Sequence, residues 1–536
     1  MPTYSVVDIF AGPGGLAEGF SSVRGPDGER AFRVELSIEK ETAAHSTLRL
    51  RAFLRQFGDT LPDLYYRFLN EGGDEPDWST SHPDAWRAAE NEAWQLELGK
   101  EEPDLRLNSR LDAIRASSGD NLILIGGPPC QAYSLVGRAR NQGKEGYVAS
   151  EDDRHFLYRE YIRILDRLRP AAFVMENVKG MLSSSVDDGE SRIFDKVLED
   201  LRGERRGGQR YRLIALSPRT RRQSEFGGFE PRAPDFVVRA EDFGVPQARH
   251  RVIVVGLRAD LAADLPETAL ADVLRKHSLA ATVGHVLDGM PRLRSGLSRG
   301  EDSAAAWKEV VVEAMARVAE LETGLSDDQQ LAFTLTAAKH LARFREQNEL
   351  PGREATGTGI ADSCPADLRG WLVDPRLSRL PNHASRSHMN SDLGRYFFAA
   401  VFGEVTGRSP KASDFPAELA PEHQNWTSGK FADRFRVQVR GGPSTTVTSH
   451  ISKDGHYFIH PDPQQCRSLS VREAARLQTF PDNYFFKGNR TQQYVQVGNA
   501  VPPLLARWIG EALLSILSAR DVRQQDEAPP KVNRVA

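Results

Sequence analysis

A lone thiol closes an apolar stretch of the chain at residues 122–134, LILIGGPPCQAYS. Cys130 follows two glycines and two prolines, and the prolines restrict the backbone that carries it. An ionised thiol in such a fixed position is a nucleophile suited to covalent catalysis. A free cysteine is also a small hydrophobe that packs in protein cores, so the thiol alone does not decide between these interpretations.

Charged and amide side chains accompany two further apolar runs. AAFVMENVKG delivers Glu176 and Asn177, and FGVPQARHRVIVV places Gln247, Arg249 and Arg251 beside another run. Parallel sheets bind ligands at the carboxyl ends of their strands, so these groups are expected to meet the thiol there. Each group alone has a structural explanation, as a core thiol, a strand-end ion pair or a surface basic cluster. Together they predict a covalent catalytic site.

The first motif of the chain is rich in glycine. VVDIFAGPGGLAEGF runs from a predicted strand through Gly12, Gly14 and Gly15 into a helix from about Leu16. Glycines let a ligand approach the backbone, and a helix start offers free N–H groups. Glu39 follows the next predicted strand, where an acid accepts hydrogen bonds from ribose hydroxyls, which indicates an adenosine-containing cofactor. A tight turn and a surface acid are the alternative.

The elements that must position these groups alternate along the first half of the chain. In residues 1–258, apolar runs such as NLILIGG and RVIVVGL are separated by helical stretches. This pattern predicts an α/β fold with a parallel sheet covered on both faces. The stretch of about 49–108 interrupts the alternation and is predicted to be a helical insertion, inside which Trp78, Trp86 and Trp94 pack.

The second half of the chain has a different pattern. Residues 259–440 lose the strand alternation and contain one amphipathic helix, AAAWKEVVVEAMARVAELE, followed by irregular sequence. Residues 441–518 become ordered again and end in a helix with an apolar face, which consists of Leu505, Ile509, Leu513 and Ile516. Residues 519–536 are predicted to be a disordered tail.

These motifs, taken in order, resemble those of the DNA (cytosine-5) methyltransferase family, of the bacterial restriction-modification type. The motifs are DIFAGPGG, GGPPCQAYS, MENV, PQARHR, RSLSVREAARLQTFPD and VGNAVPP. The resemblance covers residues 4–258 and about 441–518. It implies a Rossmann-like S-adenosylmethionine-dependent methyltransferase sheet with a smaller target-recognition domain, placed in the variable region 259–440. Residues 441–518 would then complete the catalytic domain and pack back on the cofactor site.

The resemblance assigns a catalytic role to four residues of this sequence. Cys130 would add to carbon 6 of cytosine, which makes carbon 5 able to accept a methyl group. Glu176 would contact N3 and the amino group of the base, and Arg251 would hold its O2. Arg249 would support the site. Since the reacting atom is hidden in a duplex, the base must be flipped out of the stack.

The resemblance also implies S-adenosyl-L-methionine as the methyl donor, and no metal. Glu39 would bind the ribose of the donor. Asp112 is the candidate for contact with the adenine, because the long stretch between Arg49 and Asn108 displaces the acid expected there. The residues expected to line the cofactor pocket are Phe10, Ala11, Gly12, Gly14, Gly15, Leu16, Glu39, Asp112, Pro129, Asn499 and Val501.

Several groups are candidates for contact with DNA. An arginine-rich strip between residues 201 and 222 fits either phosphate neutralisation or a solvated face; it comprises Arg202, Arg205, Arg206, Arg210, Arg212, Arg219, Arg221 and Arg222. Thr446 is a candidate phosphate contact or a strand threonine. Polar groups of the variable region are candidates for reading base edges or phosphates: Asn382, Arg386, His388 and Asn390. Cys364, His383 and His388 have poor spacing for a zinc site.

The composition bounds the setting. With 40% hydrophobic and 27% charged residues, no apolar run near the ~20 residues of a membrane span and three cysteines, the chain is expected to be a cytoplasmic enzyme that binds no membrane. The net charge of -4 gives the protein no overall attraction to DNA, so local basic patches would have to supply it. The expected partners are double-stranded DNA and a cognate restriction endonuclease, and the chain is expected to be a monomer. The alternatives are an RNA-directed (transfer RNA) member of the family and a non-catalytic DNA-binding relative.

Overall fold

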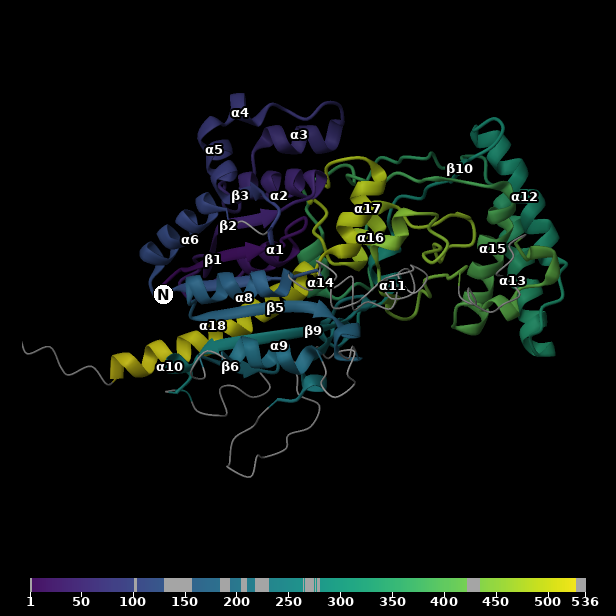
Figure 1. Cartoon of the computed structure of the whole chain (residues 1–536). Helices are drawn as coiled ribbons and strands as arrows, with labels where there is room; N and C mark the ends of the chain where they lie inside the picture. Colours follow the sequence, from purple (N-terminus) through teal and green to yellow (C-terminus); the bar gives the residue numbers. More distant parts are fainter. Residues whose placement is uncertain are drawn as a thin grey trace, which may run out of the picture.

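The computed structural model describes residues 2–100, 104–129, 157–183, 193–203, 210–216, 231–263, 280–421 and 434–526, together with residues 265, 274 and 276. The described chain forms one large sheet with helices on both faces, and a separate group of helices to one side (Figure 1).

The large sheet has eight strands in the order β3-β2-β1-β4-β5-β9-β6, with β7 paired to β9. The strands from β3 to β5 are parallel, whereas β9 is antiparallel to β5, β6 and β7. The strands are β1 (Tyr4–Ile9), β2 (Phe32–Glu39), β3 (Ala93–Gln95), β4 (Leu122–Gly126), β5 (Ala172–Val178), β6 (Tyr211–Ile214), β7 (Val237–Arg239) and β9 (His250–Arg258). The α/β fold class with a mostly parallel sheet is therefore confirmed.

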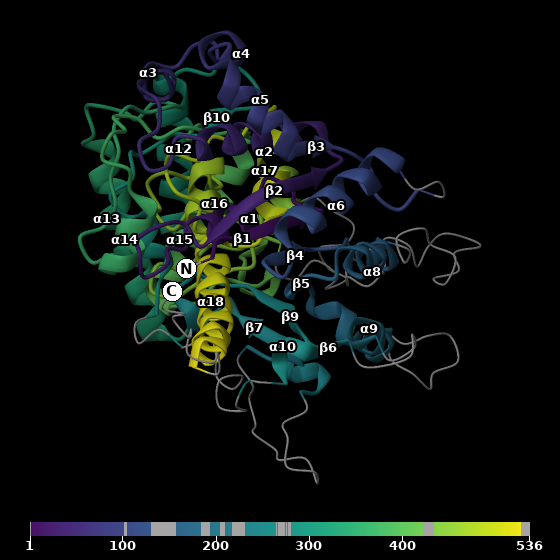
Figure 2. The ribbon, with the colours of Figure 1, turned by 90° about the vertical axis from the view of Figure 1, so that its left-hand side faces the viewer.

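Each face of the sheet has its own apolar core, because alternate residues of a strand point to opposite faces. One face packs against α1 (Gly15–Ser21) and α18 (Pro503–Asp526). The other packs against α6 (Leu105–Ser118), α8 (Leu157–Leu168) and α9 (Ile193–Arg202). Figure 2 shows α18 on one side of the sheet and these three helices on the other.

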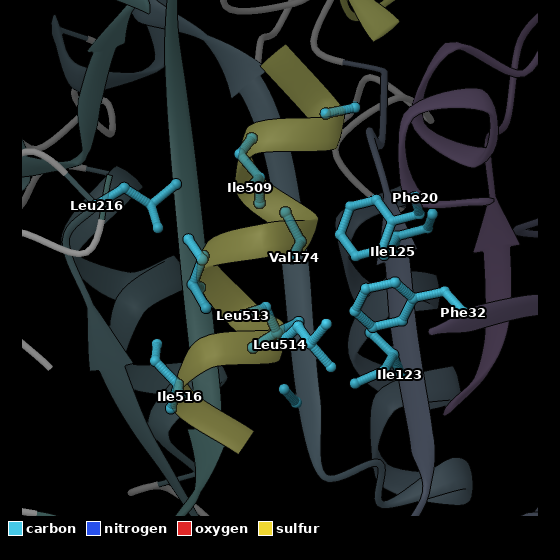
Figure 3. Packing of buried hydrophobic residues seen from close by; sticks show 14 of the residues in the cluster. Phe20, Phe32, Ile123, Ile125, Val174, Leu216, Ile509, Leu513, Leu514 and Ile516 are labelled. Atoms are coloured by element: carbon cyan, nitrogen blue, oxygen red, sulfur yellow. The ribbon is translucent and has the colours of Figure 1, made fainter. Parts of the chain in front are cut away.

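The C-terminal helix α18 returns to the start of the chain. Its expected apolar residues, Leu505, Ile509, Leu513 and Ile516, are all buried in one cluster with Phe20, Phe32 and the strand residues of that face (Figure 3). Close approach to α1 depends on Gly19, because a Cβ there would lie 2.4 Å from both the Ala506 Cβ and the Pro503 carbonyl oxygen. The helix extends to Asp526, so the tail predicted to be disordered from residue 519 is helical over its first eight residues.

The predicted insertion is mainly helical but also supplies a strand. It contains the end of α2 (Thr42–Arg55), then α3 (Asp63–Glu71), α4 (Trp78–Ser81) and α5 (Pro83–Glu92), followed by β3 and the start of α6. Trp78 and Trp86 pack around Phe53, as expected for a shared core. Trp94 lies instead in β3, which extends the sheet beyond β2, so the prediction of a purely helical segment was wrong here. A strand of three residues carries too little periodicity to be found from sequence.

The variable region is more regular than the sequence suggested. The predicted amphipathic helix is α12 (Ala304–Ala319), but two long helices follow it, α13 (Asp327–Arg345) and α15 (Asn390–Thr406). These three helices share an apolar core. The remaining elements of the described chain are short: α10 (Ala259–Ala262), α11 (Val283–Leu287), α14 (Ala366–Leu372), α16 (Val471–Leu477), α17 (Arg490–Asn499), and the strand pairs β10 (Gly296–Leu297) with β11 (Ser387–His388) and β8 (Gln247–Ala248) with β12 (Ser444–Thr445).

One described stretch, Arg490–Ala519, is long and apolar enough to cross a membrane by length and composition. It spans α17 and part of α18, and 72% of its most apolar window is buried inside the protein. The burial of Leu505 and Ile509 against the sheet accounts for this apolar character.

The contact between α1 and α18 predicts the effect of a single methyl group. Gly19→Ala should lower the free energy of unfolding by about 1–3 kcal/mol, because the added Cβ overlaps atoms of a tightly packed helix. Gly370→Ala in α14 is the matched control, since a Cβ there meets nothing within 4 Å. That change should leave stability equal or raise it by up to about 1 kcal/mol. Urea denaturation measures both; equal losses would contradict the packing argument.

Candidate active site

The glycine loop joins β1 to α1 and leaves its backbone accessible. Gly12 and Gly14 have φ of +57° and +99°, a region that favours glycine. A Cβ on Gly12 would meet nothing within 4 Å, so the space above this peptide is open. Glu39, at the end of β2, accepts a hydrogen bond from the Gly12 N–H (2.9 Å) and another from the Glu41 N–H (2.7 Å). The acid expected at a ribose therefore lies directly beside the glycine loop.

Asp8 is an acidic residue inside β1, the apolar strand that leads into the glycine loop. It is fully buried beside the Ala17 backbone of α1, and the structure records no hydrogen bond to either of its carboxylate oxygens. Burial raises the pKa of this carboxyl well above its usual range. The available signal was an acid inside an otherwise apolar strand.

The C-terminal segment closes the glycine loop from the other side. The Tyr484 hydroxyl donates to the Pro13 carbonyl, and a Cβ on Gly15 would lie 2.3 Å from the Val501 carbonyl oxygen. Asn499 is exposed at the end of α17, two residues before Val501. The residues expected at the pocket from both ends of the chain are thus brought together.

Glu176 and Arg251 form an ion pair at the carboxyl end of β5. Arg251 lies opposite Val178 on β9, so it is the diagonal neighbour of Glu176, and Nε lies 3.0 Å from Oε1. Both side chains are about 85% buried. Burial lowers the pKa of Arg251, while the carboxylate of Glu176 acts in the opposite direction. The two opposite charges therefore compensate each other at the carboxyl-end edge of the sheet, where parallel sheets generally bind ligands.

The loop that precedes Cys130 is fixed to the same place. Asn177 donates from Nδ2 to the Pro128 carbonyl (3.2 Å), and a Cβ on Gly127 would lie 3.0 Å from Oε2 of Glu176. Cys130 itself lies outside the described residues, and Pro129 is the last described residue before it. The structure thus leads the chain from β4 to Cys130 alongside the Glu176–Arg251 pair.

Arg249 points to a different set of partners. It is 2% exposed and donates to the Val447 carbonyl (2.9 Å) and the Gly498 carbonyl (3.4 Å). Burial lowers the pKa of its guanidinium well below the usual range. Nearby, Gln247 accepts from the Val447 N–H. Arg249, which immediately precedes β9, therefore joins this strand to the two segments on either side of α16.

Asp112 does not meet its expectation as an adenine contact. It lies on the exposed side of α6 in an ion pair with Arg167 (2.6 Å), near the end of α8. The ends of α6 and α8 lead into the starts of β4 and β5, the edge opposite the glycine loop. The residue beside the end of β2 comes instead from β3, in which Gln95 pairs with Glu39. Arg210, paired with Asp166, lies at that same opposite edge.

The arginine strip and Thr446 were the next candidates for contact with DNA. Five members of the arginine strip lie outside the described residues: Arg205, Arg206, Arg219, Arg221 and Arg222. Thr446 donates to the Ala248 carbonyl (2.7 Å), which favours its interpretation as a structural threonine.

Most of the polar groups singled out in the variable region are internal. His383 and His388 are buried, and both ring nitrogens of each are hydrogen-bonded within the protein. Asn382 bonds the backbone of Phe486, and Arg386 donates to two backbone carbonyls. The burial of His388 therefore contradicts a role in reading bases. Asn390 is exposed, so its role as a DNA contact stays a prediction. No metal-binding group of three His, Cys, Asp or Glu side chains occurs in the described part of the chain.

The segment RSLSVREAARLQTFPD forms a buried polar core around α16. Arg467 pairs with Glu473 (2.6 and 2.7 Å) and Arg476 with Asp482 (2.7 and 2.9 Å), with all four side chains at most 2% exposed. Other guanidinium donors of this segment bind main-chain carbonyls of the variable region, at Val286, Leu293, Gly359 and Pro381. The rest bind within residues 465–484, to the Gln465 side chain and to the carbonyls of Ser468, Pro481 and Tyr484. The motif therefore has a structural role, because it joins α16 to loops of the variable region.

The comparisons with known proteins identify the family. The model of the family described as C-5 cytosine-specific DNA methylase matches residues 109–205 and 234–515. The chain belongs to this family. This confirms the resemblance seen in the motifs and makes the protein a DNA (cytosine-5-)-methyltransferase.

Three relatives are matched over nearly their whole length. Type II methyltransferase M.Bpa9945I of Bacillus paralicheniformis is 32% identical to this methyltransferase over 96% of this chain and 99% of its own. DNA (cytosine-5-)-methyltransferase M.ApeKI of Aeropyrum pernix is 27% identical, covering 97% and 100%. Type II methyltransferase M.AgeI of Thalassovita gelatinovora is 26% identical, covering 96% and 99%.

The buried pair at α16 predicts how the stability of this methyltransferase depends on pH. Burial alone would raise the pKa of Glu473, but Arg467 outweighs it and holds the pKa well below the usual range. A depressed pKa stabilises the fold above the unfolded value, near 4.5, and this stabilisation is lost as the pH falls. Glu473→Gln should lower the free energy of unfolding at pH 7 by about 3–5 kcal/mol, because Arg467 is left buried without its counter-ion.

The control for this variant is Glu313→Gln, which removes an exposed pair with Arg317. It should cost under about 1 kcal/mol. Urea unfolding at pH 7 and between pH 5 and 3 measures both variants, and the gap between wild type and Glu473→Gln should narrow as the pH falls. A Glu473→Gln protein as stable as wild type at pH 7 would refute the assignment.

Proposed function

We propose that this methyltransferase transfers a methyl group from S-adenosylmethionine to carbon 5 of a flipped-out cytosine in a specific DNA sequence, through a covalent adduct with Cys130. The observation that carries the proposal is the Glu176–Arg251 pair, held at the carboxyl end of β5 beside the loop that leads to Cys130. A base that enters this edge meets a carboxyl group, a guanidinium group and the chain that carries the thiol.

The residues have complementary tasks in this reaction. The Cys130 thiolate forms a bond to carbon 6 of cytosine, which places electron density on carbon 5. Glu176 favours protonation at N3 as charge builds up on the ring, and Arg251 binds O2. A thiol with a pKa of about 8.5 is only partly ionised at neutral pH, so the guanidinium nearby assists. After methyl transfer, a water molecule accepts the proton from carbon 5, the electrons of that C–H bond re-form the double bond between carbons 5 and 6, and Cys130 leaves as a thiolate.

The glycine loop fits S-adenosylmethionine, which when bound supplies an electrophilic methyl group. Three observations support the fit: the open space above Gly12, the free N–H groups where α1 begins, and Glu39 beside them. Pro129, at the end of β4, lies at the same edge. We assign the adenine contact to Glu97 instead of Asp112. Glu97 follows β3, which pairs with β2, and lies 3.7 Å from Lys40, the neighbour of Glu39.

The biological role proposed is the modification arm of a restriction-modification system, with a cognate endonuclease as partner and double-stranded DNA as substrate. The match to methyltransferases named as type II over their full length supports this role. Residues 259–440, with their own helical core, are the proposed target-recognition domain. A cytoplasmic location follows from this role.

Fluorine at carbon 5 tests the covalent step. The target is first mapped by bisulfite sequencing of methylated DNA, and a duplex with 5-fluorocytosine at that position is then prepared. Fluorine cannot leave as a cation, so the adduct should persist, require S-adenosylmethionine, survive denaturing gels and map to Cys130 by peptide sequencing. Cys130→Ser should form no adduct, Glu176→Gln should form it slowly, and Cys364→Ser, a change at a buried thiol, should form it normally. An adduct at another cysteine would refute the proposal.

Calorimetry tests the cofactor pocket. Glu39→Gln should raise the Kd for S-adenosylmethionine roughly 10- to 100-fold, because charged hydrogen bonds to the ribose and to the Gly12 N–H are lost. Asp112→Asn is the matched control and should bind with unchanged affinity, since Asp112 pairs with Arg167 on the far edge of the sheet. Unchanged binding in Glu39→Gln, or equal weakening in both variants, would contradict the pocket.

A further inference from the structure

Helix α13 presents an apolar stripe to the outside of the protein. Its inner face packs against α12 and α15 through Phe333, Ala337, Leu341 and Phe344. On the opposite face, Leu331 is 60% exposed and Leu335 62% exposed, and Ala338 and Ala342 are exposed beside them. A surface leucine alone needs no explanation, but an aligned stripe on one helix marks an interaction surface.

The stripe follows the spacing of a helix–helix seam. The exposed residues Asp328, Leu331, Leu335, Ala338, Ala342 and Arg345 recur at alternating intervals of three and four. This is the spacing of the two apolar positions in a heptad, which keep one face toward a partner helix. The seam has an acidic residue at its amino end and a basic residue at its carboxyl end.

The seam is complementary to itself when reversed. If a second α13 runs antiparallel about an axis between Thr336 and Ala337, Leu331 faces Ala342 of the second copy and Leu335 faces its Ala338. Each large side chain then lies opposite a small one, which lets two helices approach to ~8 Å. In the same register Asp328 faces Arg345 of the second copy, and the same contact recurs on the other side of the axis, as two-fold symmetry requires.

We propose that a second copy of this chain binds the α13 face, forming a two-fold dimer through an antiparallel pair of α13 helices. Figures 1 and 2 show α13 at the periphery of the protein, in the helical group to one side of the sheet. Pairing through its outer face leaves the carboxyl ends of β4 and β5 accessible in both copies. One helix of 19 residues from each copy is a small interface, so the dimer is weak and depends on concentration. The monomer expected from the sequence is the state at high dilution.

Charge reversal tests both the interface and its register. In sedimentation equilibrium of the full chain, Asp328→Arg should weaken the dimer roughly tenfold or more, because two arginines then face each other twice. The double change Asp328→Arg with Arg345→Asp should restore it. Residues 328 and 345 are more than four helical turns apart, so only a contact between copies explains such a rescue.

Two further variants complete the test. Leu335→Lys should abolish the dimer, while Gln329→Lys, an exposed change on α13 outside the seam, should leave it intact. Circular dichroism should be unchanged in all of these variants, because none replaces a buried residue. A wild-type protein that stays monomeric throughout, a dimer that Leu335→Lys does not affect, or a double reversal that fails to restore association would each overturn the proposal.

Discussion

Three arginines buried around α16 constrain the rest of the structure. Arg467, Arg472 and Arg476 are at most 1% exposed, and a guanidinium that loses water must find protein acceptors for its donors. Two carboxylates from the same segment satisfy part of this need. The variable region supplies backbone carbonyls at Leu293, Pro381 and Val286, and residues 465–484 supply the other acceptors. The loops that carry these carbonyls must therefore adopt one arrangement for the core to close. Burial lowers the pKa of Arg472 to about 10, which still leaves it charged at neutral pH. A long variable region is thereby held against the α16 core by main-chain atoms, which every sequence possesses.

The same core connects the variable region with the catalytic edge. Gln478, just after α16, accepts from Gln247 and donates to the Val497 carbonyl of α17. Gln247 in turn binds the Val447 N–H, and Arg249 binds the carbonyl of the same residue. The segment that enters α16 and the strand that carries Arg251 are therefore parts of one hydrogen-bonded unit. Because this unit is buried and hydrogen-bonded, it holds the segments around Arg249 and Arg251 in fixed relative positions.

The sequence predicted the parts of the protein whose residue types are dictated by chemistry or by long periodic patterns. The longer strands of the sheet, the glycine loop with Glu39, and the apolar face of α18 were found, since each carries several residues of local pattern. β3 was not predicted, because three residues show no periodicity. Without β3 in the prediction, the acid beside the cofactor was sought in the wrong element, at Asp112. The burial of Asp8 was not predicted, although an acid inside an otherwise apolar strand was the available signal. α13 was missed because exposed leucines and alanines blur its amphipathic pattern.

The histidines of the variable region show why target recognition is harder to predict than catalysis. In sequence, His388 is a candidate for reading base edges and His383 is a histidine with poor spacing for a zinc site. In the structure both are internal, because a backbone carbonyl, two serine hydroxyls and a tyrosine hydroxyl bind their ring nitrogens. Burial lowers the pKa of His383 to about 4, so it is neutral and serves as a structural hydrogen-bonding group at physiological pH. Catalysis restricts a position to the few residue types that can do the chemistry, whereas a polar side chain in a variable loop serves a base edge and a buried carbonyl equally well. Only the packing around it decides between them.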